Sequence, residues 1–105
     1  MTPPPQRELR LPPAPRAQTV ELLYRTLGDL LVPVDQVRER YFRNLNPDNF
    51  TRALTSGRVA LPVTTLDTSA KRPRFIDIRH LAILIDAQAD AADAELAEAV
   101  PTETE

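Results

Sequence analysis

Cysteine and tryptophan are absent from this sequence, glycine occurs only twice, and histidine occurs once. Without cysteine the chain can form neither disulfides nor thiolate metal sites, and it suits a reducing compartment. No apolar run approaches the roughly 20 residues needed to span a bilayer, and the amino-terminal stretch has no hydrophobic signal segment. We therefore expect a cytoplasmic protein without contact to a membrane.

Features of enzymes and metalloproteins are missing too. The sequence has no glycine-rich loop to hold phosphate and no nucleophile with a neighbouring base. Its one histidine, His80, has no second histidine or cysteine close to it, which argues against a metal or catalytic role. The sequence thus predicts a protein that is not an enzyme and that needs no cofactor or metal.

Charge is distributed unevenly along the 105 residues. Residues 34–80 carry nine Lys or Arg against five Asp or Glu, whereas residues 81–105 carry seven acids and no Lys or Arg. A basic middle suggests a polyanionic partner, although a modest excess of this kind also occurs on ordinary solvated surfaces.

Composition divides the chain into three parts. Six of the eleven prolines lie in residues 1–17 with three arginines, which predicts a disordered Pro/Arg-rich arm. Residues 18–95 form the predicted folded domain, which is small enough for a single core. Residues 96–105 are polar and acidic, which predicts a disordered tail.

Hydrophobic spacing predicts four helices, over residues 19–27, 34–43, 47–56 and 78–95. The third is the best marked, because Asn46 can accept the unpaired N–H groups at its start, Pro47 is tolerated in its first turn, and Gly57 suits its end. Asp77 is a suitable N-cap for the fourth. The turn between the second and third helices is short, as in a helix-turn-helix motif.

Residues 59–66 and 73–77 are rich in β-branched or aromatic side chains and predict the two strands of a hairpin. The linker between them carries Lys71 and Arg72 near its tip; it is longer than the tightest hairpin turns and lacks glycine. A helix-turn-helix, a hairpin and a closing helix give the predicted fold class. It is mainly α with a small β-hairpin, arranged as a winged helix-turn-helix.

The outward side of the third helix carries side chains that can contact DNA. Arginine matches O6 and N7 of guanine, asparagine can pair with adenine, and threonine can contact a phosphate or a thymine methyl. A basic hairpin tip can reach the adjacent backbone or minor groove. The predicted DNA-binding residues are Asn46, Asn49, Thr51, Arg52, Thr55, Arg58, Lys71, Arg72 and Arg74.

Each of these residues also has a structural alternative. Arg52 could pair with Asp48 one helical turn earlier, a contact worth a few tenths of a kcal/mol. Lys71 and Arg72 could be ordinary solvated loop charges. Tyr41 and Phe42 fit a core role better than stacking on nucleic acid.

Several short segments carry a resemblance to a known family. They are an apolar start at 19–23, VPVDQV at 32–37, RYF at 40–42, a helix from Leu45 to Gly57 that contains Arg52, the pair Leu61 and Pro62, Ser69 with Lys71, and IRHLAILIDA at 78–87. These segments resemble the pyocin activator protein (PrtN) family of small bacterial and prophage transcription activators.

The resemblance implies a sequence-specific DNA-binding activator of phage or pyocin genes, with a fold similar to excisionase and MerR-type winged helices. It implies Arg52 and Lys71 as DNA contacts. The implied partners are double-stranded promoter or operator DNA and RNA polymerase. The implied location is the bacterial cytoplasm, on the nucleoid when the protein is bound to DNA.

Two other functions fit the same pattern. One is an excisionase-like architectural protein that bends DNA, and the other is a phage-encoded protein that binds a host protein. A single short recognition helix also suggests a homodimer, for which the alanine-rich last helix offers a pairing surface. The acidic tail suggests a further hypothesis, in which it folds back over the basic surface and reduces non-specific DNA binding.

Overall fold

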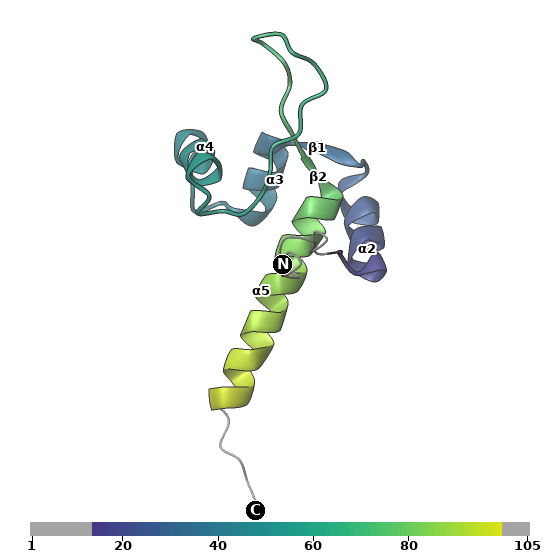
Figure 1. Cartoon of the computed structure of the whole chain (residues 1–105), viewed down its shortest axis with the longest axis vertical. Helices are drawn as coiled ribbons and strands as arrows, with labels where there is room; N and C mark the ends of the chain where they lie inside the picture. Colours follow the sequence, from purple (N-terminus) through teal and green to yellow (C-terminus); the bar gives the residue numbers. More distant parts are fainter. Residues whose placement is uncertain (1–13, 100–105) are drawn as a thin grey trace, which may run out of the picture.

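The structure is a computed structural model that describes residues 14–99. Its elements follow in the order α2 (Ala17–Leu27), β1 (Leu31–Pro33), α3 (Val34–Tyr41), α4 (Pro47–Ser56), β2 (Phe75–Asp77) and α5 (Ile78–Ala99). Figure 1 shows α3 and α4 on one side of α5, α2 on the other side, and a long loop that rises from the small sheet. The mainly helical fold with a small antiparallel sheet is the predicted one, and it resembles a winged helix.

The helix bounds differ slightly from those expected. α2 begins two residues earlier than predicted, at Ala17, and ends at Leu27 as predicted; its C-cap is Gly28, whose φ of 84° lies in the left-handed region that glycine adopts readily. α3 ends at Tyr41 because Phe42 leaves helical geometry, with φ −132° and ψ 47°. α5 continues to Ala99, so residues 96–99 are helical. The rest of the expected arm and tail, residues 1–13 and 100–105, lies outside the described residues.

The predicted hairpin is wrong in its first strand. β2 pairs antiparallel with β1, with Leu31 opposite Asp77 and Pro33 opposite Phe75. Residues 59–66 contribute a single bridge, in which Thr64 and Phe75 exchange backbone hydrogen bonds of 2.8 and 2.9 Å. The predicted second strand, 73–77, is shortened to Phe75–Asp77.

Local contacts explain why residues 59–66 do not form a strand. The Val59 N–H donates to the Ala53 carbonyl at the end of α4, and the Leu61 N–H donates to Val59 (3.1 and 2.9 Å). Pro62 has no N–H to donate. Val59 and Leu61 are buried, which anchors the segment as a loop on the core. We call the loop of residues 60–74, which begins here and returns at β2, the wing.

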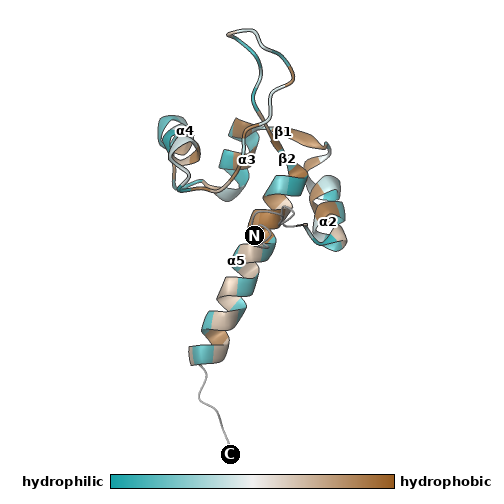
Figure 2. Cartoon of the chain, in the orientation of Figure 1, coloured by the Kyte–Doolittle hydropathy of each residue, from teal (hydrophilic) through white to brown (hydrophobic). Residues whose placement is uncertain are grey.

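The core lies where the sheet meets the start of α5. Its most deeply buried large side chains are Phe50, Ile76, Ile78, Leu81, Val32 and Val37. Figure 2 shows hydrophobic residues gathered on β1, β2 and the upper part of α5. Burial of these side chains holds α3, the sheet and α5 together. No helix among residues 14–99 is long and apolar enough to cross a membrane.

Candidate nucleic-acid interface

α4 is held against α3 by aromatic packing and by hydrogen bonds of the turn. Phe50 of α4 is buried, and its ring centroid lies 4.9 Å from that of Phe42. The Leu45 N–H donates to the Phe42 carbonyl (3.0 Å), and the Arg38 guanidinium donates to the Leu45 carbonyl (3.1 Å). With one side buried in this way, the other side of α4 faces outward. Phe42 therefore packs against the core as expected, whereas Tyr41, for which the same role was expected, is 41% exposed.

Asn46 starts α4, as predicted. Its Oδ1 accepts a hydrogen bond of 2.7 Å from the Asn49 backbone N–H, and Pro47 occupies the first helical position. The helix ends at Gly57, which has φ 82°. Because the Asn46 side chain is engaged in this cap, its clearest role is to set where the outward face of α4 begins.

Two depressions collect most of the predicted contact residues of α4. Asn49, Arg52 and Arg58 line one of about 360 Å³, together with Ser56. Thr51 is half-buried and lies in a second, of about 400 Å³, with Arg74 at the base of the wing. Thr55 is exposed on α4 and lines neither of these depressions. Asn49 and Arg52 therefore lie in one depression beside α4, and Thr51 lies in another.

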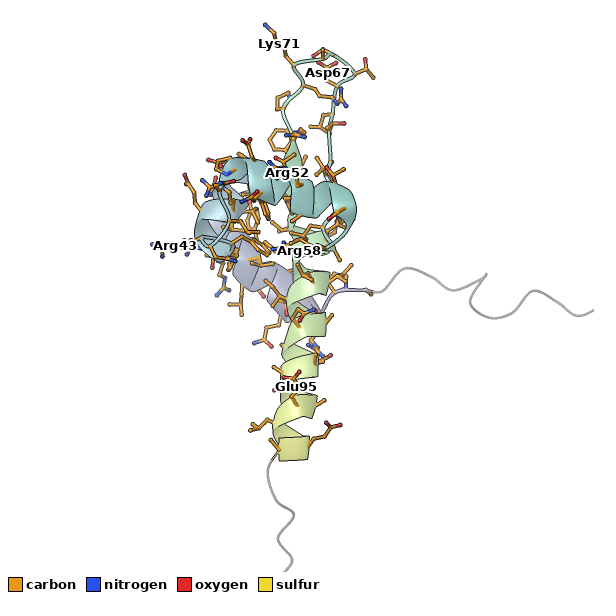
Figure 3. All side chains as sticks on the ribbon, turned by 90° about the vertical axis from the view of Figure 1, so that its left-hand side faces the viewer. Arg43, Arg52, Arg58, Asp67, Lys71 and Glu95 are labelled. Carbon is orange, nitrogen blue, oxygen red and sulfur yellow. The ribbon has the colours of Figure 1, made fainter. Side chains whose placement is uncertain are left out.

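The wing holds the remaining predicted residues. Lys71 and Arg72 are both exposed, and Figure 3 shows Lys71 at the tip, far above Arg58. The Arg72 backbone N–H and guanidinium both donate to the Ser69 carbonyl (3.2 and 3.0 Å). Arg72 therefore shapes the turn at the tip, whereas the Lys71 ammonium extends outward.

The basic residues divide into two groups. Among the eleven Lys and Arg of residues 14–99, Arg16, Arg25, Arg38 and Arg79 form ion pairs with carboxylates. The other seven form no ion pair within the described residues, and we call them the basic face: Arg40, Arg43, Arg52, Arg58, Lys71, Arg72 and Arg74. Within the described residues Arg52 does not form the ion pair with Asp48 that helical spacing would allow.

Sequence reasoning missed two members of this face, Arg40 and Arg43. Both are exposed, at the end of α3 and in the turn before α4. Figure 3 shows Arg43 at the left edge of the view, with Arg52 and Arg58 nearer its centre. The signal was present, because basic residues in the turn of a helix-turn-helix lie beside the recognition helix and can reach phosphates.

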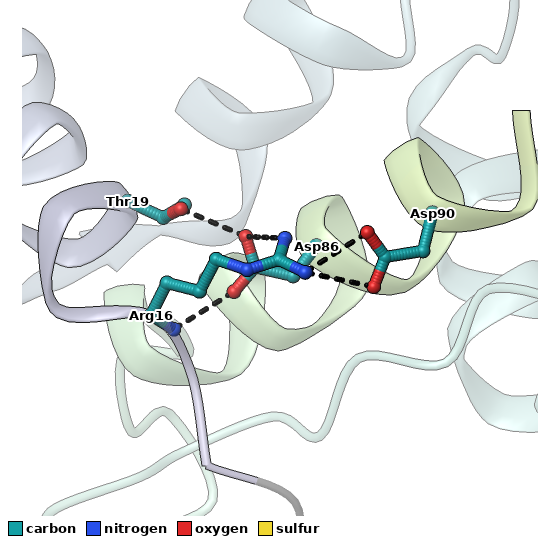
Figure 4. Close-up of polar contacts among 4 residues, drawn as sticks. All are labelled: Arg16, Thr19, Asp86 and Asp90. Carbon is teal, nitrogen blue, oxygen red and sulfur yellow. Dashed lines mark hydrogen bonds and ion pairs between the residues drawn. The ribbon is translucent and has the colours of Figure 1, made fainter. Parts of the chain in front are cut away.

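The paired cation Arg16 belongs to a separate cluster, which we call the clamp, where α2 meets α5 (Figure 4). The Arg16 backbone N–H donates to Asp86 (2.9 Å), and its guanidinium contacts Asp86 and Asp90 (3.4 and 2.9 Å). The Thr19 hydroxyl donates to Asp86 (2.7 Å). Hydrogen bonds from the Arg16 backbone and from Thr19 lower the pKa of Asp86. The clamp is structural and lies outside the basic face.

Within residues 14–99 no group of three or more His, Cys, Asp or Glu side chains is placed to hold a metal ion. The basic face is the candidate functional surface that we consider. Its chemistry, exposed guanidinium and ammonium groups beside amide and hydroxyl side chains, suits phosphate and base edges.

Comparison with known proteins agrees with the resemblance seen in the sequence. Residues 19–92 match the family model described as pyocin activator protein PrtN. No curated protein and no solved structure matches the chain. Because the family match covers most of the sequence, the chain belongs to the pyocin activator protein family, which supports a role as a transcriptional activator rather than as an enzyme.

Proposed function

We propose that this protein activates transcription in the bacterial cytoplasm by binding specific double-stranded DNA with α4 and the wing. α4 enters the major groove, where Asn49 and Arg52 contact base edges and Thr51 and Thr55 contact phosphates or thymine methyls. Lys71, Arg72 and Arg74 hold the backbone from the wing, and Arg58 extends the contact at the end of α4.

The observation that carries this proposal is the separation of paired from unpaired cations. All seven residues of the basic face lie between Arg40 and Arg74, in the part of the chain that forms the end of α3, the turn, α4 and the wing. Only two carboxylates, Asp48 and Asp67, occur in that stretch. A surface with this charge attracts a polyanion, and phosphate contacts dominate the affinity of proteins for DNA.

Family membership favours an activator over the two alternative functions. An activator needs DNA and the transcription machinery as partners, and RNA polymerase is the second partner that we propose. An excisionase-like protein would bend DNA without raising promoter activity. A protein that only binds a host protein would show no dependence on salt-sensitive phosphate contacts.

The test is a salt titration of binding to promoter DNA from the protein's own genomic neighbourhood, against competitor DNA. We compare the wild type with Arg52→Ala, Lys71→Ala and the control Arg25→Ala. Arg25 is an exposed cation on α2, paired with Glu21 and outside the basic face. All three variants lose one positive charge, so a difference among them reports position rather than net charge.

We expect Arg52→Ala to lose about 1 to 3 kcal/mol and the preference for one sequence. Lys71→Ala should weaken binding to all sequences alike and reduce the salt slope by about 1. Arg25→Ala should bind as the wild type does. Absence of any complex at about 50 mM salt, where non-specific basic proteins still bind, would overturn the proposal.

A further inference from the structure

In the distal part of α5, residues 87–99, the one ion pair with the rest of the described chain is that of Asp90 with Arg16 in the clamp. Every residue of this segment is exposed, and Figure 1 shows it extending well beyond the rest of the fold. Isolated helices shorter than about 12 to 15 residues are marginal in water, because most helical stability comes from packing an apolar side. A helix that projects in this way is stabilised if another molecule covers it.

An apolar stripe runs along the projecting helix. Ile85, Ala89, Ala92 and Leu96 follow one another at spacings of four, three and four, the pattern of a coiled-coil seam. The same line begins inside the fold with Ile78 and Ala82, both 0% exposed. The stripe therefore continues the packing side of α5, yet its last large member, Leu96, is 63% exposed.

An apolar cavity opens beside the point where the stripe leaves the core. It has a volume of about 450 Å³ and is lined by Tyr41, Phe42, Val59, Leu84 and Ile85. Arg58 and Gln88 also line it. Tyr41 is 41% exposed despite its size, so this region presents apolar surface to a partner.

We propose that a second copy of this chain covers the stripe, with its α5 antiparallel to the first. One register satisfies both copies: Ile85 of each lies opposite Leu96 of the other, and Ala89 of each lies opposite Ala92 of the other. This register is self-complementary, as a two-fold interface requires. Leu96 of the second copy then lies beside the apolar cavity of the first.

The charges along α5 favour the antiparallel arrangement. On one side of the stripe, Asp93 of the second copy comes near the clamp, where the Arg16 guanidinium, 57% exposed, offsets part of the charge of Asp86 and Asp90. On the other side, Glu95 of the second copy faces Gln88, which lines the same cavity as Arg58. A parallel pair would instead place Asp90, Asp93 and the following acids of both copies together, with no Lys or Arg from either α5 beyond Arg79.

The same register gives a spacing that suits DNA. With a rise of 1.5 Å per residue, the two α5 amino termini lie about 38 Å apart along the pair, near one turn of B-DNA. Each amino terminus directly follows β2 and the wing. This spacing is a consequence of the pairing. The test of the pairing needs no DNA, so the pairing can be disproved while the proposed function stands.

The first experiment is the mass of the full chain in solution by sedimentation equilibrium up to about 100 µM, a range in which association follows mass action. We expect a dimer for the wild type and a monomer for Leu96→Asp. The control Leu66→Asp, at a 75% exposed leucine of the wing, should remain dimeric. A monomeric wild type over the whole range would overturn the proposal and leave the stripe to a different protein.

The second experiment tests the register. Because the sequence contains no cysteine, only the introduced thiols can form disulfides. Mixing Ala89→Cys with Ala92→Cys under mild oxidation should give the mixed disulfide in preference to either homodimer, because these positions face each other only in the antiparallel pair. Preferred homodimers of each single variant would indicate a parallel pair and overturn the antiparallel register. Circular dichroism of each variant confirms that the helices are retained.

Discussion

Asn46 fixes the start of α4 through one hydrogen bond, from the Asn49 N–H to its Oδ1. Loss of such a cap costs about 1 kcal/mol. We expect Asn46→Ala to lower the free energy of unfolding by this amount in a urea titration. Asn46→Asp retains the acceptor and should stay within about 0.5 kcal/mol of the wild type. Equal stability of the alanine variant and the wild type would contradict the capping role.

Asp77 links the stability of the fold to pH. Its side chain is buried at the start of α5 and accepts hydrogen bonds from the Arg79 guanidinium and backbone N–H (2.7 and 2.8 Å). The side-chain hydrogen bond from Arg79 is the main cause that lowers the pKa of Asp77, and burial opposes it. Because the folded pKa lies below the unfolded value of about 3.9, this stabilisation is present above that value and is lost as the pH falls through the folded pKa.

We expect Asp77→Asn to be less stable than the wild type at pH 7, by about 1 to 2 kcal/mol, since it loses a charged hydrogen-bond acceptor. Below pH 4 the difference should shrink, because the wild-type carboxyl becomes neutral as well. Urea titrations between pH 7 and pH 2.5 measure both effects. The control Asp67→Asn, at an exposed carboxylate of the wing, should follow the wild type at every pH. A constant difference between Asp77→Asn and the wild type would show that charge is not involved.

At the scale of the element, α4 was predictable and the sheet was not. α4 carries its own start and end, in Asn46, Pro47 and Gly57, so local rules fixed both bounds. The sheet depends on β1, which lies more than 40 residues before β2 in the sequence. Residues 59–66 have strand-like composition, but Val59 and Leu61 are buried, and the Val59 N–H donates to Ala53 of α4 instead of to a strand. Tertiary packing overrode propensity there.

The sequence likewise indicated some residues of the candidate site and not others. The outward face of α4 followed from helical spacing around Phe50, and the exposed Lys71 followed from the polar linker. Arg43 was missed although the predicted helix-turn-helix already placed it in the turn before α4. The pairing of Arg16 with Asp86 is invisible in the sequence because 70 residues separate them, whereas the pair of Arg38 with Asp35 follows from helical spacing.

The clamp should stabilise the first turn of α2 against local unfolding. Arg16 and Thr19 reach Asp86 across 70 and 67 residues of sequence, and they are the polar link between the start of α2 and α5. We expect Asp86→Ala to speed amide hydrogen exchange in α2, beginning with the Val20 N–H that donates to the Arg16 carbonyl. The Phe50 N–H of α4 should keep its rate, and so should the whole of α2 in the control Glu21→Ala, which removes only the exposed pair with Arg25. Unchanged exchange at Val20 in Asp86→Ala would contradict the clamp.

Over the whole molecule, the tip of the wing and the acidic part of α5 lie at opposite ends. Figure 3 shows Lys71 at one end of the long axis and Glu95 towards the other. Up to Ala99, the acidic segment therefore points away from the basic face, which argues against the hypothesis that it folds back over that face. The molecule thus combines a packed domain, which ends near Asp90 at the clamp, with a projecting acidic helix.

This division predicts that the domain is stable without the projecting helix. A chain that stops after Asp90 keeps the clamp and every core side chain, and residues 91–99, the removed part that the structure describes, are all exposed. Its free energy of unfolding should therefore stay within roughly 1 kcal/mol of the wild type when both are measured at concentrations that keep them monomeric. Leu81→Ala in the full chain is the contrast, because Leu81 is 1% exposed and its truncation leaves a cavity that costs about 2 to 5 kcal/mol. Loss of cooperative unfolding in the shortened chain would show that distal α5 belongs to the folding unit of the monomer, and its stripe would then have a second role besides pairing.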